Sequence, residues 1–169
     1  MTDEEVERLA ETGRALTLRL LACAATVSAA DVARTGNLVT PDDVRAIHPA
    51  AGELWATALK VAADGATPPT ETELQAALVR DGKYVDDHGA VLQAAMLALS
   101  TTTGHPPMFR TAAADVLGLV YRLRLQSSAD ALADAAGRFS EADSFELLLR
   151  EGTQIRDLYD RLRTLRGEP

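Results

Sequence analysis

Few residues in this chain stand in a pattern that could carry out chemistry. A phosphate-binding loop needs Gly, four residues, then Gly-Lys and Ser or Thr, because backbone N–H groups and the lysine must surround phosphate oxygens. The chain has one Gly-Lys pair, Gly82-Lys83, but Tyr84 follows it and the upstream glycine is missing. No serine stands in a Gly-x-Ser-x-Gly elbow either. ATP hydrolysis by that loop and serine-based hydrolysis are therefore not expected.

Metal and acid–base sites have equally little support. The histidines, His48, His88 and His105, are isolated from one another, whereas zinc sites use ligands in closely spaced pairs. Carboxylate metal sites in helical bundles use Glu-x-x-His pairs, which the chain lacks. Asp86-Asp87-His88 is the densest group of titratable residues, and we expect it to cap a helix. We expect no catalytic residue, no metal and no cofactor, and hence no enzyme.

Charge and composition exclude further classes of protein. The chain has 169 residues and a formal net charge of −8, and such an acidic field repels phosphate backbones at long range. Its first residues are acidic where a signal peptide would be basic, and no run reaches the roughly 18 apolar residues of a membrane span. The single cysteine, Cys23, is expected to be a small buried residue. We expect a cytoplasmic protein with no membrane contact.

The sequence predicts helices, and these helices must position any surface that binds a partner. Ala and Leu are abundant and no segment alternates with a period of two, so the fold is expected to be all-α. Apolar residues spaced by three and four predict a first helix over about residues 2–34. Thr40-Pro41 is a strong helix start, and Pro49 opens another helix that ends near Gly65.

Candidate N-cap residues predict the starts of the next two helices. Thr70 and Glu73 can form a capping box, in which each side chain satisfies the other residue's backbone N–H. Asp87 is expected to cap the helix that follows. Together these elements predict a compact helical head over residues 1–107.

The last third of the chain predicts a long αα-hairpin over residues 108–169. Its first helix, about residues 108–136, is apolar around much of its circumference, and the last helix carries apolar residues at heptad-like spacing. More apolar surface is present than one neighbour can cover, which indicates self-association. We expect this interface to use Val116, Leu119, Val120, Leu123, Leu148, Ile155, Leu158 and Leu162.

Arginines of the last helix offer an alternative surface. Ordinary pairing with Glu151, Asp157 and Asp160 at helical spacing would account for them. If they instead face one side, the chain could be a free-standing helical regulatory protein that binds nucleic acid. The candidate basic face comprises Arg156, Arg161, Arg163 and Arg166.

The order of these signals resembles the N-terminal domain of the DnaB-type replicative DNA helicases, from about Leu16 to Ala136. That family has a helix-ending Gly, a Pro-containing turn, a capped helix ending in Leu, then Gly, an apolar residue and a Gly-Gly pair. Ile47-His48-Pro49 and Leu54-Trp55 upstream, and Val116-Leu117 and Arg124 downstream, are also similar to it. The residues of the clearest stretch are Gly65, Pro68, Thr70, Leu74, Leu78, Gly82, Tyr84 and Gly89.

The chain departs from the family pattern at a few positions. Thr70 stands for the family's capping Asp, Ala51 for a His, and His88 for the first Gly of the pair. His105-Pro106-Pro107 replaces the family's Asn-containing entry to the long helix.

The resemblance implies a helical head with a hairpin that dimerises, as in the collar of the helicase ring where primase docks. The final helix resembles the segment that links the collar to the ATPase domain, so any helicase activity would need an ATPase domain outside this chain. We expect a non-catalytic interaction and oligomerisation module that acts in DNA replication through helicase or primase contacts. A homodimer or higher oligomer is expected, with DNA contact at most indirect or weak.

Overall fold

The computed structural model describes residues 2–65 and 67–168, and over these residues the chain is helical without a β-strand. The all-α class is therefore confirmed. The elements are α1 (Asp3–Ala24), α2 (Ala29–Gly36), α3 (Pro41–Ile47), α4 (Pro49–Asp64), α5 (Glu71–Arg80), α6 (Asp86–Ser100), the short 3-10 helix η1 (Pro106–Met108), α7 (Phe109–Arg138) and α8 (Glu141–Arg166).

The single helix predicted over residues 2–34 is wrong. α1 ends at Ala24, and α2 begins at Ala29 after Ser28, whose hydroxyl accepts a hydrogen bond from the backbone N–H of Asp31 at 3.2 Å. Ser28 thus acts as an N-cap and starts a new helix. The apolar spacing does not reveal this break, because both helices bury a face on the same core.

Local capping explains most of the other boundaries. Thr70 and Glu73 form the predicted capping box, and Thr40 forms a second one with Asp43. The prediction that Asp87 caps α6 is wrong, because the N-cap residue is Val85, which has no side-chain cap hydrogen bond. Asp87 lies in the first turn of that helix instead.

The core of the head is built around α4, which packs on α1, α2, α3, α5 and α6. The Trp55 side chain is 0 % exposed, and its indole N–H donates a 2.7 Å hydrogen bond to the carbonyl of Val39. Cys23 is buried, as predicted. One hydrophobic cluster continues from these residues into α7 and α8, so the head and the base of the hairpin share a single core.

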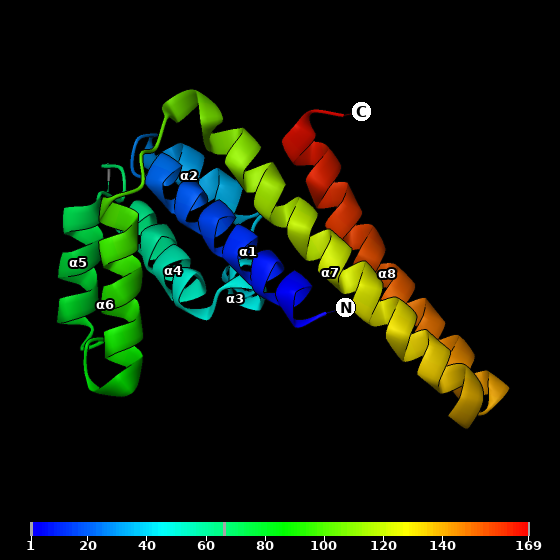
Figure 1. The fold of residues 1–169 in the computed structure, drawn as a ribbon. Helices are drawn as coiled ribbons and strands as arrows, with labels where there is room; N and C mark the ends of the chain where they lie inside the picture. Colours follow the sequence, from blue (N-terminus) through cyan, green and yellow to red (C-terminus); the bar gives the residue numbers. More distant parts are fainter. Residues whose placement is uncertain (1, 66, 169) are drawn as a thin grey trace.

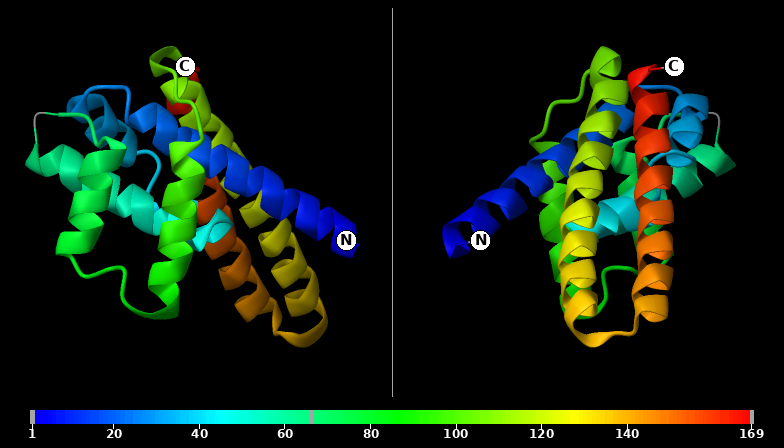
Figure 2. Two further views of the ribbon diagram at one scale, coloured as in Figure 1. Left: turned by 60° about the vertical axis from the view of Figure 1, so that its left-hand side comes forward. Right: turned by 90° about the vertical axis from the view of Figure 1, so that its right-hand side faces the viewer.

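The hairpin and the α5–α6 pair lie at opposite ends of the molecule (Figure 1). The first half of α7 packs on α1 and α3, whereas the second half continues with α8 beyond the head. The right-hand view of Figure 2 shows α7 and α8 side by side in front of the head, and the start of α1 standing away from it. None of the helices described here is long and apolar enough to cross a bilayer.

Candidate functional site

The residues predicted for self-association divide into buried and exposed groups. Five of them, Val116, Leu119, Val120, Leu158 and Leu162, are buried inside the chain itself. Leu123 and Ile155 are half-buried, and the Leu148 side chain is 48 % exposed. The buried five hold the hairpin together and attach it to the head, so only the others are accessible to a partner.

The two helices of the hairpin meet along a regular seam. On α8, Leu147, Glu151, Leu158, Leu162 and Leu165 follow one another in steps of three, four or seven residues and are buried or half-buried against α7. This is the spacing that keeps one side of a helix on its neighbour. Residues one position further along α8 fall on a second stripe beside the seam.

This second stripe, together with its counterpart on α7, forms a surface that we name the outer face. The rings of Tyr121 and Tyr159 meet with centroids 6.1 Å apart, which places the two stripes on the same side of the hairpin. Helical spacing then adds the remaining members. The outer face comprises Tyr121, Leu125 and Leu132 of α7 and Phe145, Leu148, Ile155 and Tyr159 of α8, all exposed or half-buried.

The opposite side of the hairpin borders a groove against α3, with a volume of about 890 Å³. Val120, Leu123 and Leu158 line it with apolar surface, and charged side chains surround them. This inner groove therefore contains three of the residues predicted for self-association and one of the predicted basic face, Arg161.

Arg161 joins α8 to the head across this groove. Its guanidinium contacts the Asp43 carboxylate, with the shorter N–O distance at 2.7 Å, and donates a hydrogen bond to the carbonyl of Leu38. A second carboxylate, Asp157, lies 3.0 Å from its Nε. The side chains of Arg161 and Asp43 are both largely buried. Arg161 is thus taken up by an intramolecular bridge and is not part of an open basic face.

A second polar cluster links α7 and α8 further from the head. The Glu151 carboxylate accepts hydrogen bonds from the Ser128 hydroxyl at 2.6 Å and from Arg124 at 2.7 Å, and Arg124 also contacts Gln154. The Ser128 hydrogen bond holds the pKa of Glu151 below its ordinary value. The charges of Arg124 and Arg150 act in the same direction, whereas burial acts against them.

Lowering the pH is expected to weaken the distal hairpin through Glu151. Because its folded-state pKa is depressed, its contribution to stability is fully present above the ordinary pKa of 4.5 and is lost as the pH falls through the folded-state pKa. The test is urea unfolding of the wild type and Glu151→Gln between pH 7 and pH 3. The stability difference between them should shrink below about pH 4.5. Glu146→Gln, an exposed change on the same helix, is the control, and a constant difference for Glu151→Gln would contradict the assignment.

The remaining predicted arginines lie at the base of the outer face or beyond it. Arg156 and Arg166 are exposed, and the guanidinium of Arg163 lies over the Tyr159 ring, 5.9 Å from its centroid. Arg122, which the sequence reasoning did not select, is exposed beside Tyr121. Arg122 directly follows Tyr121, which belongs to the outer face of α7, so this stripe of α7 could have indicated it.

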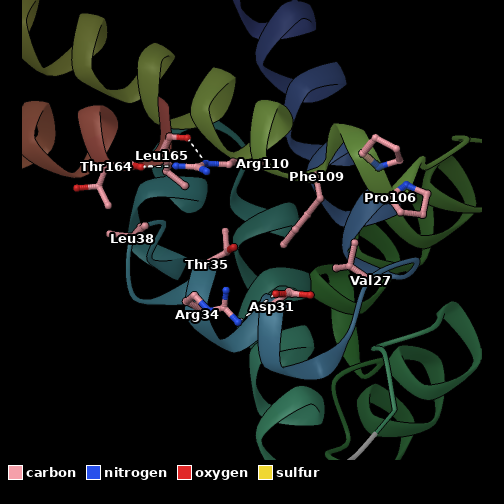
Figure 3. A pocket seen from close by; sticks show the side chains of 11 residues that line it. Val27, Asp31, Arg34, Thr35, Leu38, Pro106, Phe109, Arg110, Thr164 and Leu165 are labelled. Atoms are coloured by element: carbon pink, nitrogen blue, oxygen red, sulfur yellow. Dashed lines mark hydrogen bonds and ion pairs between the residues drawn. The ribbon is translucent and has the colours of Figure 1, made fainter. Parts of the chain in front are cut away.

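A pocket with a volume of about 370 Å³ lies where α2, η1 and the end of α8 meet (Figure 3). Phe109 and Leu38 give it apolar walls. Arg110 donates hydrogen bonds to the last carbonyls of α8, at Thr164 and Leu165. The Thr164 carbonyl also accepts a hydrogen bond from the backbone N–H of Gly167 at 3.2 Å. The residues of this pocket therefore fix the end of α8 against the start of α7. The spacing of apolar residues in the sequence does not predict this contact.

The histidines do not converge. His48 ends α3, and burial lowers its pKa, with the positive charge of Arg14 acting in the same direction. Within the described part of the chain, no group of three or more His, Cys, Asp or Glu side chains is arranged to hold a metal ion.

Accessible apolar surface on the hairpin is thus the most distinctive feature of the chain. Comparison of the sequence and the structure with protein-family models, curated proteins and solved structures found no match.

Proposed function

We propose that this chain is a non-catalytic interaction module that self-associates through the outer face of its hairpin. The observation that carries the proposal is the continuous apolar stripe on both helices beyond the head. Leu125, Phe145, Leu148 and Tyr159 are each at least 44 % exposed, and they lie on one side of the hairpin. Single exposed apolar residues are common on proteins, but a contiguous stripe of them is typical of an interaction surface.

Self-association fits the form of this surface. Two antiparallel helices that present a flat apolar side can form a four-helix contact with a second pair, in which the apolar area leaves water. A two-fold contact uses the same patch on both copies, so one stripe is sufficient to build it.

We further propose that the chain acts in DNA replication. The order and spacing of residues from Gly65 to Gly89, and the head-plus-hairpin arrangement, support a module similar to the replicative helicase collar. In that role the chain acts through contacts with a helicase ATPase domain or with primase. Pull-down of the purified replicative helicase and primase of the same organism tests the proposed replication role. If neither protein binds, the replication role is refuted and only the proposed self-association remains.

Replacing Leu148 with Asp is expected to abolish or strongly weaken self-association. A carboxylate placed in an apolar contact loses its hydration without a partner, so the dissociation constant should rise at least about tenfold. Sedimentation equilibrium and light scattering across a range of protein concentrations measure the effect.

The matched control is Leu97→Asp on α6. Leu97 is 70 % exposed and lies on the α5–α6 pair, at the other end of the molecule. This variant should associate like the wild type. A strictly monomeric wild type at high concentration would overturn the proposal. Leu119→Asp and Val120→Asp are unsuitable as tests, because both side chains are buried in the chain's own core and their loss would unfold it.

A further inference from the structure

Opposite charges flank the outer face at its two ends. Glu141 lies at the tip of the hairpin, where α7 connects to α8, and Arg163 lies at the base, next to the head. Both continue the outer stripe of α8 in steps of four residues, from Phe145 and from Tyr159. Neither charged side chain forms an ion pair within residues 2–65 and 67–168. The right-hand view of Figure 2 shows α3, in cyan, behind the hairpin, so the head leaves the outer face open to a second copy.

Gly152 stands at the middle of the outer stripe on α8. It follows Leu148 by one helical turn and precedes Ile155 by one turn. A Cβ added to Gly152 would meet no atom of the described chain within 4 Å. Glycine inside an exposed helix costs about 1 kcal/mol relative to alanine, so this residue does not serve the stability of α8. It does allow the backbone of another helix to approach α8 closely at this point.

The outer residues on either side of Gly152 form matching pairs. Phe145 stands seven residues before it and Tyr159 seven residues after it. Glu141 stands eleven residues before it and Arg163 eleven residues after it. When two α8 helices cross antiparallel at Gly152 about a two-fold axis, residues at equal distances from the crossing lie opposite each other. An aromatic ring then meets an aromatic ring, and a carboxylate meets a guanidinium.

The outer stripe of α7 has the same symmetry at the same level. The Ser128 hydroxyl donates a 2.6 Å hydrogen bond to the carboxylate of Glu151, the residue before Gly152, so Ser128 lies level with the crossing point. Leu125 stands three residues before Ser128 and Leu132 four residues after it. The same antiparallel contact therefore places Leu125 of each copy opposite Leu132 of the other. The two helices thus indicate one register independently.

We propose that two copies pack outer face against outer face in antiparallel orientation, with the tip of each hairpin over the base of the other and the two-fold axis at Gly152. This inference rests on the proposed self-association and names the part of the second copy that covers each end of the outer face. Packing with both tips together would gather the Glu141 carboxylates at one end of the dimer and the Arg163 guanidiniums at the other, where like charges repel.

Charge reversal in the full chain tests this register. Glu141→Arg and Arg163→Glu should each raise the dissociation constant of the homodimer by about five- to tenfold, because like charges then face each other at both ends. In an equimolar mixture of the two variants, both contacts of the heterodimer again join opposite charges. Its dissociation constant should therefore return to within about twofold of the wild-type value. Sedimentation equilibrium and native mass spectrometry of differently tagged chains measure both effects.

The matched control is Glu146→Arg, which makes the same change of charge at an exposed position on another side of α8. It should associate like the wild type. If both reversals behave like this control while Leu148→Asp still disrupts the dimer, the antiparallel register is wrong and the proposed function stands. If the reversals weaken association but their mixture does not restore it, the pairing is overturned. A wild type that remains monomeric refutes the proposed function itself.

The distance between two spin labels reports the orientation of the hairpins directly. Ala142→Cys introduces an exposed thiol at the tip, whereas the native Cys23 is buried. Residue 142 stands ten residues before Gly152, so antiparallel packing should separate the labels of the two copies by about 30 Å along the helix axis. Double electron–electron resonance measures this separation. A separation near the roughly 10 Å between packed helices would place the tips together and overturn the proposed orientation.

Discussion

Replacing Trp55 with alanine is expected to remove about 3–5 kcal/mol from the free energy of unfolding. The indole is the largest fully buried side chain, and its loss leaves a cavity at the centre of the head. Its N–H also donates to the buried carbonyl of Val39, which would lose that donor. Domains of this size are typically stable by about 5–15 kcal/mol, so the variant should lie close to its unfolding threshold. Urea unfolding followed by circular dichroism at 222 nm measures the loss.

Trp55→Phe separates the two contributions. Phenylalanine fills much of the indole volume but cannot donate the hydrogen bond, so we expect a smaller loss of about 1–3 kcal/mol. A loss below about 1 kcal/mol in the alanine variant would contradict the position of Trp55 in the core.

The parts of the fold that depend on neighbouring residues could be predicted from the sequence. Thr40, Thr70 and Pro49 each mark a helix start through contacts within a few residues, and all three starts are confirmed. The sequence does not predict the break before α2, because apolar residues keep the same spacing on both sides of it. Ser28 is the N-cap, but a single serine is a weak signal of a helix start. The start of α6 was misplaced because it has no side-chain cap to recognise.

The hairpin shows a different limit of sequence analysis. Its two helices could be predicted, but the apolar residues belong to two stripes one position apart, which spacing alone merges into one. Which stripe faces α7 depends on how the helices are rotated, and that is decided by distant contacts. Leu158 is buried in the seam, whereas its neighbour Tyr159 is exposed on the outer face.

Arg161 is the clearest case of a role set by a distant partner. Near Asp157 in sequence it looked like a surface residue with a helical neighbour, and that contact does exist. Its main partner, however, is Asp43, 118 residues earlier in the chain. No local pattern connects the two residues, so the bridge could be found only from the three-dimensional structure.

Replacing Asp43 with alanine is expected to cost about 3–5 kcal/mol of stability, the second large effect. The carboxylate has two roles, because it accepts hydrogen bonds from the backbone N–H and hydroxyl of Thr40 and also pairs with Arg161. Without it, α3 loses part of its cap and a largely buried guanidinium loses its main counter-charge. Urea unfolding measures the total loss. In the Asp43→Ala variant, hydrogen exchange of α8 around Arg161 should be faster than in the wild type. Exchange of α5, which does not contact the bridge, should change less.

A double-mutant cycle isolates the bridge from the cap. Arg161→Ala leaves the contacts of Asp43 with Thr40 in place, so it should cost less than Asp43→Ala. Once Arg161 is absent, removing Asp43 no longer strands a buried positive charge. The double variant should therefore be more stable than the sum of the two single losses predicts, by about 1–3 kcal/mol. Additive losses, within about 0.5 kcal/mol, would mean that the pairing of Asp43 with Arg161 contributes no stability beyond the other contacts of the two side chains.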